Sequence, residues 1–162
     1  PDKEVFADLK IMDGGRLEAG YAFEAGADSV SVLSVAYDDT IRAVVQTANE
    51  WGRSVLADLI GVKEIAVRAM ELDRLGVHYI CVHTASDIQH QGFHPQEPLR
   101  QLSGIMNPKK LAAAGGIKAD TVEEIVRIGV GIIIVGQGIV AAPDRVKAAS
   151  EIKSRLLREG RA

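Results

Sequence analysis

A repeated unit of about 25 residues constrains the fold of this chain more than any other feature of its sequence. In each copy a helical pattern ends at a glycine and is followed by a short run of β-branched and other apolar residues. The copies are AGADSVSVLS, EWGRSVLADL, LGVHYICVHT and IGVGIIIVGQ. Glycine often ends a helix because it adopts the left-handed conformation cheaply. The glycines expected to end helices are Gly26, Gly52, Gly76 and Gly129.

The repeat predicts six strands, each followed by a helix or a helical turn. The expected strands span residues 4–9, 29–33, 54–60, 79–83, 110–114 and 131–135. Strands that alternate with helices indicate a parallel sheet, and near-continuous apolar strands indicate that both of its faces are covered. Two α/β architectures satisfy this pattern, an open doubly wound sheet and a (β/α)8 barrel, and the count of six suits the open sheet. A last amphipathic helix is expected from about Asp144 to Leu157.

Composition excludes several classes of protein. A chain of 162 residues predicts one domain over residues 1–162. A net charge of −3 and 4% aromatic residues argue against a nucleic-acid partner. No apolar stretch approaches the roughly 20 residues that span a bilayer, so no membrane partner is expected. Cys81 is the only cysteine, which predicts a reducing, cytoplasmic location and a buried thiol.

The stretch VFADLKIMD, residues 5–13, places charges in an apolar strand. Because side chains alternate along a strand, Asp8 and Lys10 are expected on one face, with Asp13 just beyond the strand. Opposite charges on such a strand are costly unless they are paired or used. The stretch therefore predicts a site at the carboxyl end of a strand, and a structural ion pair is the alternative explanation.

Two glycine turns and a histidine follow later strands. Gly115-Gly116 and Gly136-Gln137-Gly138 each lie where a strand passes into a helix. Such turns let backbone N–H groups converge on an anion, although they also occur as plain tight turns. His83 ends the fourth strand beside them, which favours a role in proton transfer. The CxxC, HExxH, P-loop and GxGxxG motifs are absent, so zinc, kinase and dinucleotide chemistry has no support.

The residues Asp8-x-Lys10-x-x-Asp13 match the DxKxxD motif of the orotidine 5′-monophosphate decarboxylase suprafamily. With VHTASDIQHQG, AAGGIKADT and IIIVGQGI, the string FADLKIMDGG resembles the 3-hexulose-6-phosphate synthase group of that suprafamily most closely. The resemblance covers essentially the whole chain. It implies a (β/α)8 TIM barrel in which the six strands are strands three to eight, with the first two βα units missing.

The resemblance also implies a reaction, a cofactor and partners. The chain would be an aldehyde-lyase of formaldehyde fixation in the ribulose monophosphate pathway. It would condense formaldehyde with ribulose 5-phosphate to 3-hexulose 6-phosphate through an enediolate stabilised by Mg²⁺. Asp8 would be a magnesium ligand, Lys10 would face the reacting carbons, and His83 would be the acid/base. Asp13 would reach the active site of the partner in a homodimer. The phosphate would be held by Gly115, Gly116, Gly136 and Gln137.

The resemblance has departures and alternatives. The family takes a magnesium-binding glutamate and a substrate-binding aspartate from its first two strands, which are expected to lie outside this chain. Ser34 and Ala85 stand where glycine is expected, which predicts crowding at the strand ends. The alternatives are a 3-keto-L-gulonate-6-phosphate decarboxylase, or a truncated barrel fragment that binds phosphate esters without turnover. Gln137 and the run from Thr84 to Asp87 stand where the decarboxylases tend to have arginines, which favours the synthase.

Overall fold

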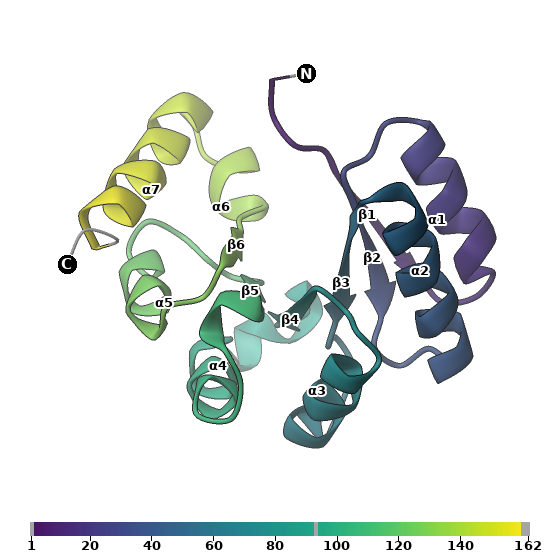
Figure 1. Ribbon diagram of the computed structural model, residues 1–162. Helices are drawn as coiled ribbons and strands as arrows, with labels where there is room; N and C mark the ends of the chain where they lie inside the picture. The colour runs from purple at the N-terminus through teal and green to yellow at the C-terminus, as the bar shows by residue number, and fades with distance from the viewer. Residues whose placement is uncertain (1, 93, 160–162) are drawn as a thin grey trace. The chain divides into compact units, whose positions relative to one another are not determined.

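Strands and helices alternate along the chain, as the repeat predicts. The structure is a computed structural model that describes residues 2–92 and 94–159. It divides into two compact units, Pro1–Cys81 and Val82–Ala162. The strand β4 (Tyr79–His83) spans the boundary between them. Each unit has its own packed strands and helices (Figure 1).

The first unit is built from parallel strands covered by helices. Its elements before β4 are β1 (Phe6–Ile11), α1 (Gly15–Glu24), β2 (Ser29–Leu33), α2 (Asp38–Trp51), β3 (Ser54–Asp58) and α3 (Ile65–Arg74). β1 pairs with β2, β2 with β3, and β3 with β4, all in parallel. α1 and α2 lie side by side (Figure 1). The core is mostly apolar, because the middles of β2 and β3 are buried valine, leucine and alanine residues with the single exception of Ser31 in β2.

The second unit repeats the pattern with shorter strands. Its elements after β4 are η1 (Ser86–Gln91), α4 (Gln96–Ser103), η2 (Pro108–Lys110), β5 (Leu111–Ala114), α5 (Val122–Ile128), β6 (Ile132–Ile134), α6 (Gln137–Val140) and α7 (Arg145–Glu159). β5 is buried throughout and pairs in parallel with β6. The Thr84 N–H donates to the Ala114 carbonyl at 3.1 Å, which brings the end of β4 beside the end of β5.

The order of the strands decides between the two expected architectures. In the first unit the neighbours are β1-β2-β3-β4, and in the second β5 lies beside β6. A doubly wound sheet reverses its order at a switch point, whereas a barrel keeps sequential neighbours. The sequential order is that of a barrel, so the strand count pointed toward the wrong architecture.

The predicted elements are mostly confirmed. Strands 29–33 and 79–83 match, and the four expected glycines all have a positive φ. The first strand begins later and extends to Ile11, because an irregularity lets it continue past Lys10. The third strand ends at Asp58, two residues earlier than expected, and α7 ends at Glu159. Within the described residues, no helix is both long and apolar enough to cross a membrane.

Candidate active site

The backbone of β1 is irregular at Lys10. Ala7 is opposite Val30 and Ile11 is opposite Val32, so four steps along β1 match two along β2. Lys10 has a φ of 51°, and it is the only residue other than glycine with a positive φ in the described part of the chain. Such a conformation is costly for a residue with a Cβ, and it occurs chiefly at functional sites. The bulge therefore marks this strand as more than scaffold.

The side chain of Lys10 lies between two carboxylates. Its Nζ donates to Asp8 Oδ2 at 2.5 Å and lies 3.6 Å from Asp58 Oδ2. The Asp8 side chain is half exposed, whereas that of Asp58 is only 3% exposed. The second oxygen of Asp58 accepts the N–H of Ile60 at 2.9 Å. Asp8, Lys10 and Asp58 thus form a charged cluster that opens to solvent on the side of Asp8.

Electrostatics keep Lys10 positively charged. Burial alone would lower the pKa of its ammonium, but the hydrogen bond that it donates to Asp8 and the charges of Asp8 and Asp58 outweigh burial and raise that pKa. Lys10 is therefore a cation and hydrogen-bond donor at neutral pH, not a proton acceptor. This is the state that stabilises negative charge developing on a bound substrate.

Cys81 lies next to the cluster, since it pairs with Asp58 across β3 and β4. It is buried, as the sequence predicts. Burial and the negative charges of Asp58 and Asp8 raise the pKa of its thiol well above the usual range, against an opposing effect of Lys10. Because only a thiolate is a good nucleophile, the cluster does not activate this cysteine.

Asp13 is separate from the cluster. It lies after the end of β1 and is exposed, and its Oδ1 accepts the N–H of Gly14 at 2.7 Å. No hydrogen bond or ion pair among the described residues joins it to Lys10. The structure therefore brings together two of the three charged residues that the motif singles out.

The other predicted site residues lie in the second unit. His83 is the half-buried last residue of β4. Gly115 and Gly116 follow β5 with φ values of 93° and 68°, so two successive N–H groups lie in a left-handed turn. Gly136 and Gln137 follow β6, where Gln137 is the first residue of α6.

The two glycine turns are in close contact with neighbouring backbone. A Cβ on Gly115 would overlap the carbonyl oxygen of Thr84, and a Cβ on Gly138 would overlap that of Ile117. The turn after β5 therefore packs against both the end of β4 and the start of α6. This packing explains the glycines at Gly115 and Gly138 without any ligand, while the neighbouring Gly116 faces only the Gln89 side chain.

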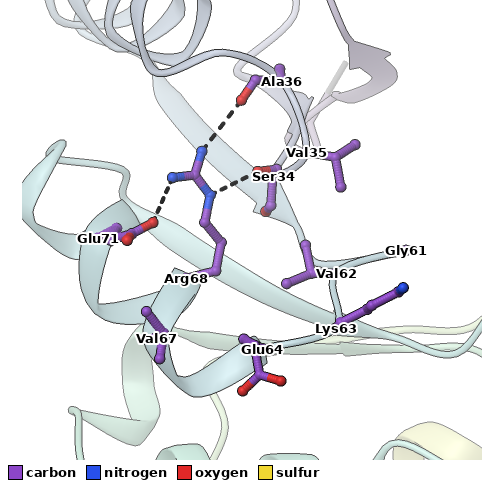
Figure 2. A pocket seen from close by; sticks show the side chains of 10 residues that line it. All are labelled: Ser34, Val35, Ala36, Gly61, Val62, Lys63, Glu64, Val67, Arg68 and Glu71. Atoms are coloured by element: carbon purple, nitrogen blue, oxygen red, sulfur yellow. Dashed lines mark hydrogen bonds and ion pairs between the residues drawn. The ribbon is translucent and has the colours of Figure 1, made fainter.

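One cavity of the first unit is lined by none of the residues of the charged cluster. It has a volume of about 470 Å³ and is lined by residues after β2, residues after β3 and α3 (Figure 2). Arg68 dominates it: its Nε donates to the Ser34 carbonyl at 2.8 Å and its Nη2 to the Ala36 carbonyl at 3.3 Å (Figure 2). Ion pairs from Nη1, at 2.9 Å to Asp38 and 2.8 Å to Glu71, use both N–H groups of that nitrogen. Arg68 thus fixes the loop after β2, with four of its five N–H groups in these bonds.

Ser34 is buried just after β2, and the crowding expected there stays a prediction. The residue is 1% exposed, and its hydroxyl oxygen has no hydrogen-bond partner among the described residues. We expect Ser34→Ala to raise the free energy of unfolding by about 1 kcal/mol, because burying a hydroxyl costs its hydration and no hydrogen bond compensates for that cost. Urea denaturation followed by circular dichroism measures this change. A destabilised Ser34→Ala variant would show that the hydroxyl has a partner after all.

The site also contains two polar residues that are not part of the DxKxxD motif, Asp58 and Ser31. Asp58 stands at a strand end in the sequence, but its pairing with Lys10 depends on two intervening strand pairings. Ser31 bonds both Asp8 and the backbone of Lys10, yet it reads as an ordinary strand residue. A polar residue in the centre of an apolar strand was the only signal for Ser31.

Sequentially ordered parallel β/α units, with a charged cluster toward the carboxyl ends of the strands, define a barrel-type enzyme fold. The family model described as "Orotidine 5'-phosphate decarboxylase / HUMPS family" matches residues 2–152. The chain belongs to this family.

Relatives narrow the comparison within the family. A 3-hexulose-6-phosphate synthase of Staphylococcus saprophyticus is 44% identical over 98% of this chain and 74% of its own length. The crystal structure of a 3-hexulose-6-phosphate synthase from Salmonella typhimurium matches with a TM-score of 0.94 at 38% identity, over 98% of this chain and 75% of that one. A 3-keto-L-gulonate-6-phosphate decarboxylase from Vibrio cholerae is more distant, with a TM-score of 0.79 at 25% identity over 94% and 72%.

Proposed function

We propose that this chain is an aldehyde-lyase that condenses formaldehyde with ribulose 5-phosphate to give 3-hexulose 6-phosphate. The observation that carries the proposal is the identity of 44% to a 3-hexulose-6-phosphate synthase across nearly the whole chain. The decarboxylase alternative has less support, because the decarboxylase match falls to 25% identity. The Asp8–Lys10–Asp58 cluster supplies chemistry that suits the condensation.

The condensation needs a carbanion equivalent next to the carbonyl of ribulose 5-phosphate. Loss of a proton from C1 gives an enediolate, and C1 then forms a bond to the carbon of formaldehyde. The formaldehyde oxygen takes up a proton and becomes the new primary alcohol. The Lys10 ammonium donates hydrogen bonds to the oxygens on which negative charge develops, and His83 carries the proton.

The donor set of the cluster suits Mg²⁺. In residues 2–92 and 94–159, no group of three or more His, Cys, Asp and Glu side chains is placed to hold a metal ion. Mg²⁺ does not require such a group, since it commonly uses one or two carboxylates together with water and substrate oxygens. Asp8 would bind the magnesium ion through its exposed side. Asp58 is the second carboxylate that contacts the Lys10 ammonium. The bound ion would supply positive charge for the enediolate oxygens.

The phosphate of the substrate binds at the two glycine turns of the second unit. Gly115 and Gly116 offer successive N–H groups in a left-handed turn, an arrangement that favours anions. Gly136 and Gln137 complete this site from the turn after β6. Because the phosphate lies far along the substrate from C1, its binding orients the reacting carbons without joining the chemistry.

The six strands correspond to strands three to eight of a (β/α)8 barrel, and residues 1–162 form one domain. About a quarter of each synthase relative lies outside the match, since the chain covers 74% and 75% of them. Exposed apolar residues also lie in β1 and just after it, with Leu9 at 45% and Met12 at 49% exposed. Two further βα units would cover them. Asp13, which is exposed and apart from the cluster, serves the active site of a second copy in a homodimer.

The test is formaldehyde consumption with ribulose 5-phosphate and Mg²⁺, set beside release of carbon dioxide from 3-keto-L-gulonate 6-phosphate. We expect turnover in the first assay and little or none in the second. Turnover only in the second assay would assign the decarboxylase reaction instead. Tight binding of ribulose 5-phosphate without turnover in either assay would identify a phosphate-binding fragment.

A further inference from the structure

Ser31 is a fully buried polar residue in the middle of β2. Its neighbours Val30 and Val32 pair with Ala7 and Ile11 of β1, so Ser31 lies opposite the irregular segment that contains Asp8 and Lys10. A buried hydroxyl is costly unless it is hydrogen-bonded. The hydrogen bonds that Ser31 makes therefore indicate its role.

The directions of both bonds follow from the donors involved. The Lys10 N–H can only donate, so the Ser31 oxygen accepts it at 2.8 Å. The single hydroxyl proton is then directed at Asp8 Oδ1, 2.7 Å away, because a carboxylate only accepts. One side chain thus satisfies the backbone of the bulge and one oxygen of the carboxylate.

These two bonds hold the cluster in place. In a regular ladder the Lys10 N–H would pair with a carbonyl of β2, but at a φ of 51° it meets the hydroxyl instead. With Oδ1 of Asp8 held by Ser31, Oδ2 is presented to the Lys10 ammonium. The left-handed conformation of Lys10 and the orientation of Asp8 therefore depend on the same hydroxyl.

We infer that Ser31 is a positioning residue for the condensation: its hydroxyl sets the backbone of Lys10 and the carboxylate of Asp8 in the geometry that the reaction uses. The inference rests on the proposed function for its kinetic consequence, but not for its structural one. Because Ser31 is fully buried, it acts only through the two residues that it orients.

The sharpest test compares Ser31→Thr with Ser31→Val. The two side chains have nearly the same shape, and only threonine keeps the hydroxyl, so any crowding by the added methyl affects both equally. We expect Ser31→Val to show a kcat about 10- to 100-fold below that of Ser31→Thr, because supporting residues of this kind typically contribute that much. The KM for ribulose 5-phosphate should change little, since the phosphate supplies binding elsewhere.

A second readout does not depend on turnover. Crystal structures of the two variants give the Lys10 backbone conformation and the Lys10 Nζ–Asp8 Oδ2 distance directly. We expect Ser31→Thr to keep a φ near 51° and the contact at 2.5 Å, and Ser31→Val to lose both. This measurement separates positioning from general destabilisation.

The outcomes are distinct. If Ser31→Val and Ser31→Thr differ in kcat by less than about twofold and share one Lys10 conformation, the inference is overturned. If the wild type shows no turnover, the proposed function fails, while the crystal structures of the two variants still decide the role of Ser31. Ser34→Ala is the matched control, since it removes a buried serine hydroxyl that has no partner, and it should leave kcat unchanged. Should Ser31→Val not fold, Ser31→Ala replaces it in the same comparison with Ser31→Thr.

Discussion

Lys10→Met should lower kcat/KM for the condensation by about 100- to 1,000-fold, because it removes the cation that faces the developing negative charge. Methionine keeps the length of the side chain and much of its packing, so the loss reports the charge. Steady-state kinetics with ribulose 5-phosphate and formaldehyde measure it. Lys153→Met, which changes an exposed lysine on α7, is the matched control and should retain full activity.

The same variant tests the cluster as a structural unit. Lys10→Met leaves the buried Asp58 without its ammonium, which should cost about 1–2 kcal/mol of unfolding free energy, since Lys10 is partly exposed. Lys10→Arg keeps a cation beside Asp58 and should stay near wild type in stability while still losing activity. Equal stability of Lys10→Met and wild type would contradict the coupling of Lys10 to Asp58.

The pH dependence of this contribution has a definite sign. The pKa of Lys10 is raised in the folded protein, so its stabilising effect is complete below the ordinary lysine pKa. It is lost as pH rises through the higher folded pKa. The difference in unfolding free energy between wild type and Lys10→Met is therefore expected to be constant from about pH 6 to about pH 9, a range that lies below the ordinary lysine pKa. It should shrink above that range.

Gly115→Ala should destabilise the chain by at least about 3 kcal/mol, the largest effect on stability that we expect of a single methyl group. Two causes add: the φ of 93° is unfavourable for alanine, and the new Cβ would overlap the Thr84 carbonyl oxygen. Backbone cannot move aside as a side chain can, so the end of β4 or the turn itself must shift. Chemical denaturation measures the loss.

Gly116→Ala is the matched comparison. Its φ of 68° imposes a similar conformational cost, but its Cβ would meet only the end of the Gln89 side chain, at 3.3 Å. We expect a loss of about 1–2 kcal/mol, which is the backbone contribution alone. If the two variants were equally stable, the contact with Thr84 would not be what requires glycine at position 115.

The element order could be predicted from the sequence because it depends on local chemistry. A glycine at a helix end and a β-branched run after it report on a few residues at a time, and those elements are present. The pairing of Asp8 with Lys10 was also within reach, since alternation along one strand places both side chains on the same face. These features need no information from distant parts of the chain.

The remainder of the site depends on long-range geometry that no local pattern carries. Nothing in the run VFADLKIMD indicates that Lys10 has a positive φ, because the group that accepts its N–H is Ser31, on the neighbouring strand. Likewise, Asp58 reaches Lys10 only because β3 lies two strands away in the sheet. The number of strands favoured an open sheet for a similar reason, since counting strands does not reveal their order, whereas the resemblance to the family implied the barrel.

The burial of Asp58 limits how this active site can be redesigned. A carboxylate that is 3% exposed and faces the Lys10 ammonium ties the two positions into one choice. An engineer who wants a neutral residue at position 10 must first make position 58 neutral as well, for example with Asp58→Asn. The reverse order passes through an intermediate that is both inactive and less stable. A library that varies only position 10 would discard neutral residues there, whereas a library that varies positions 10 and 58 together would retain the double substitution.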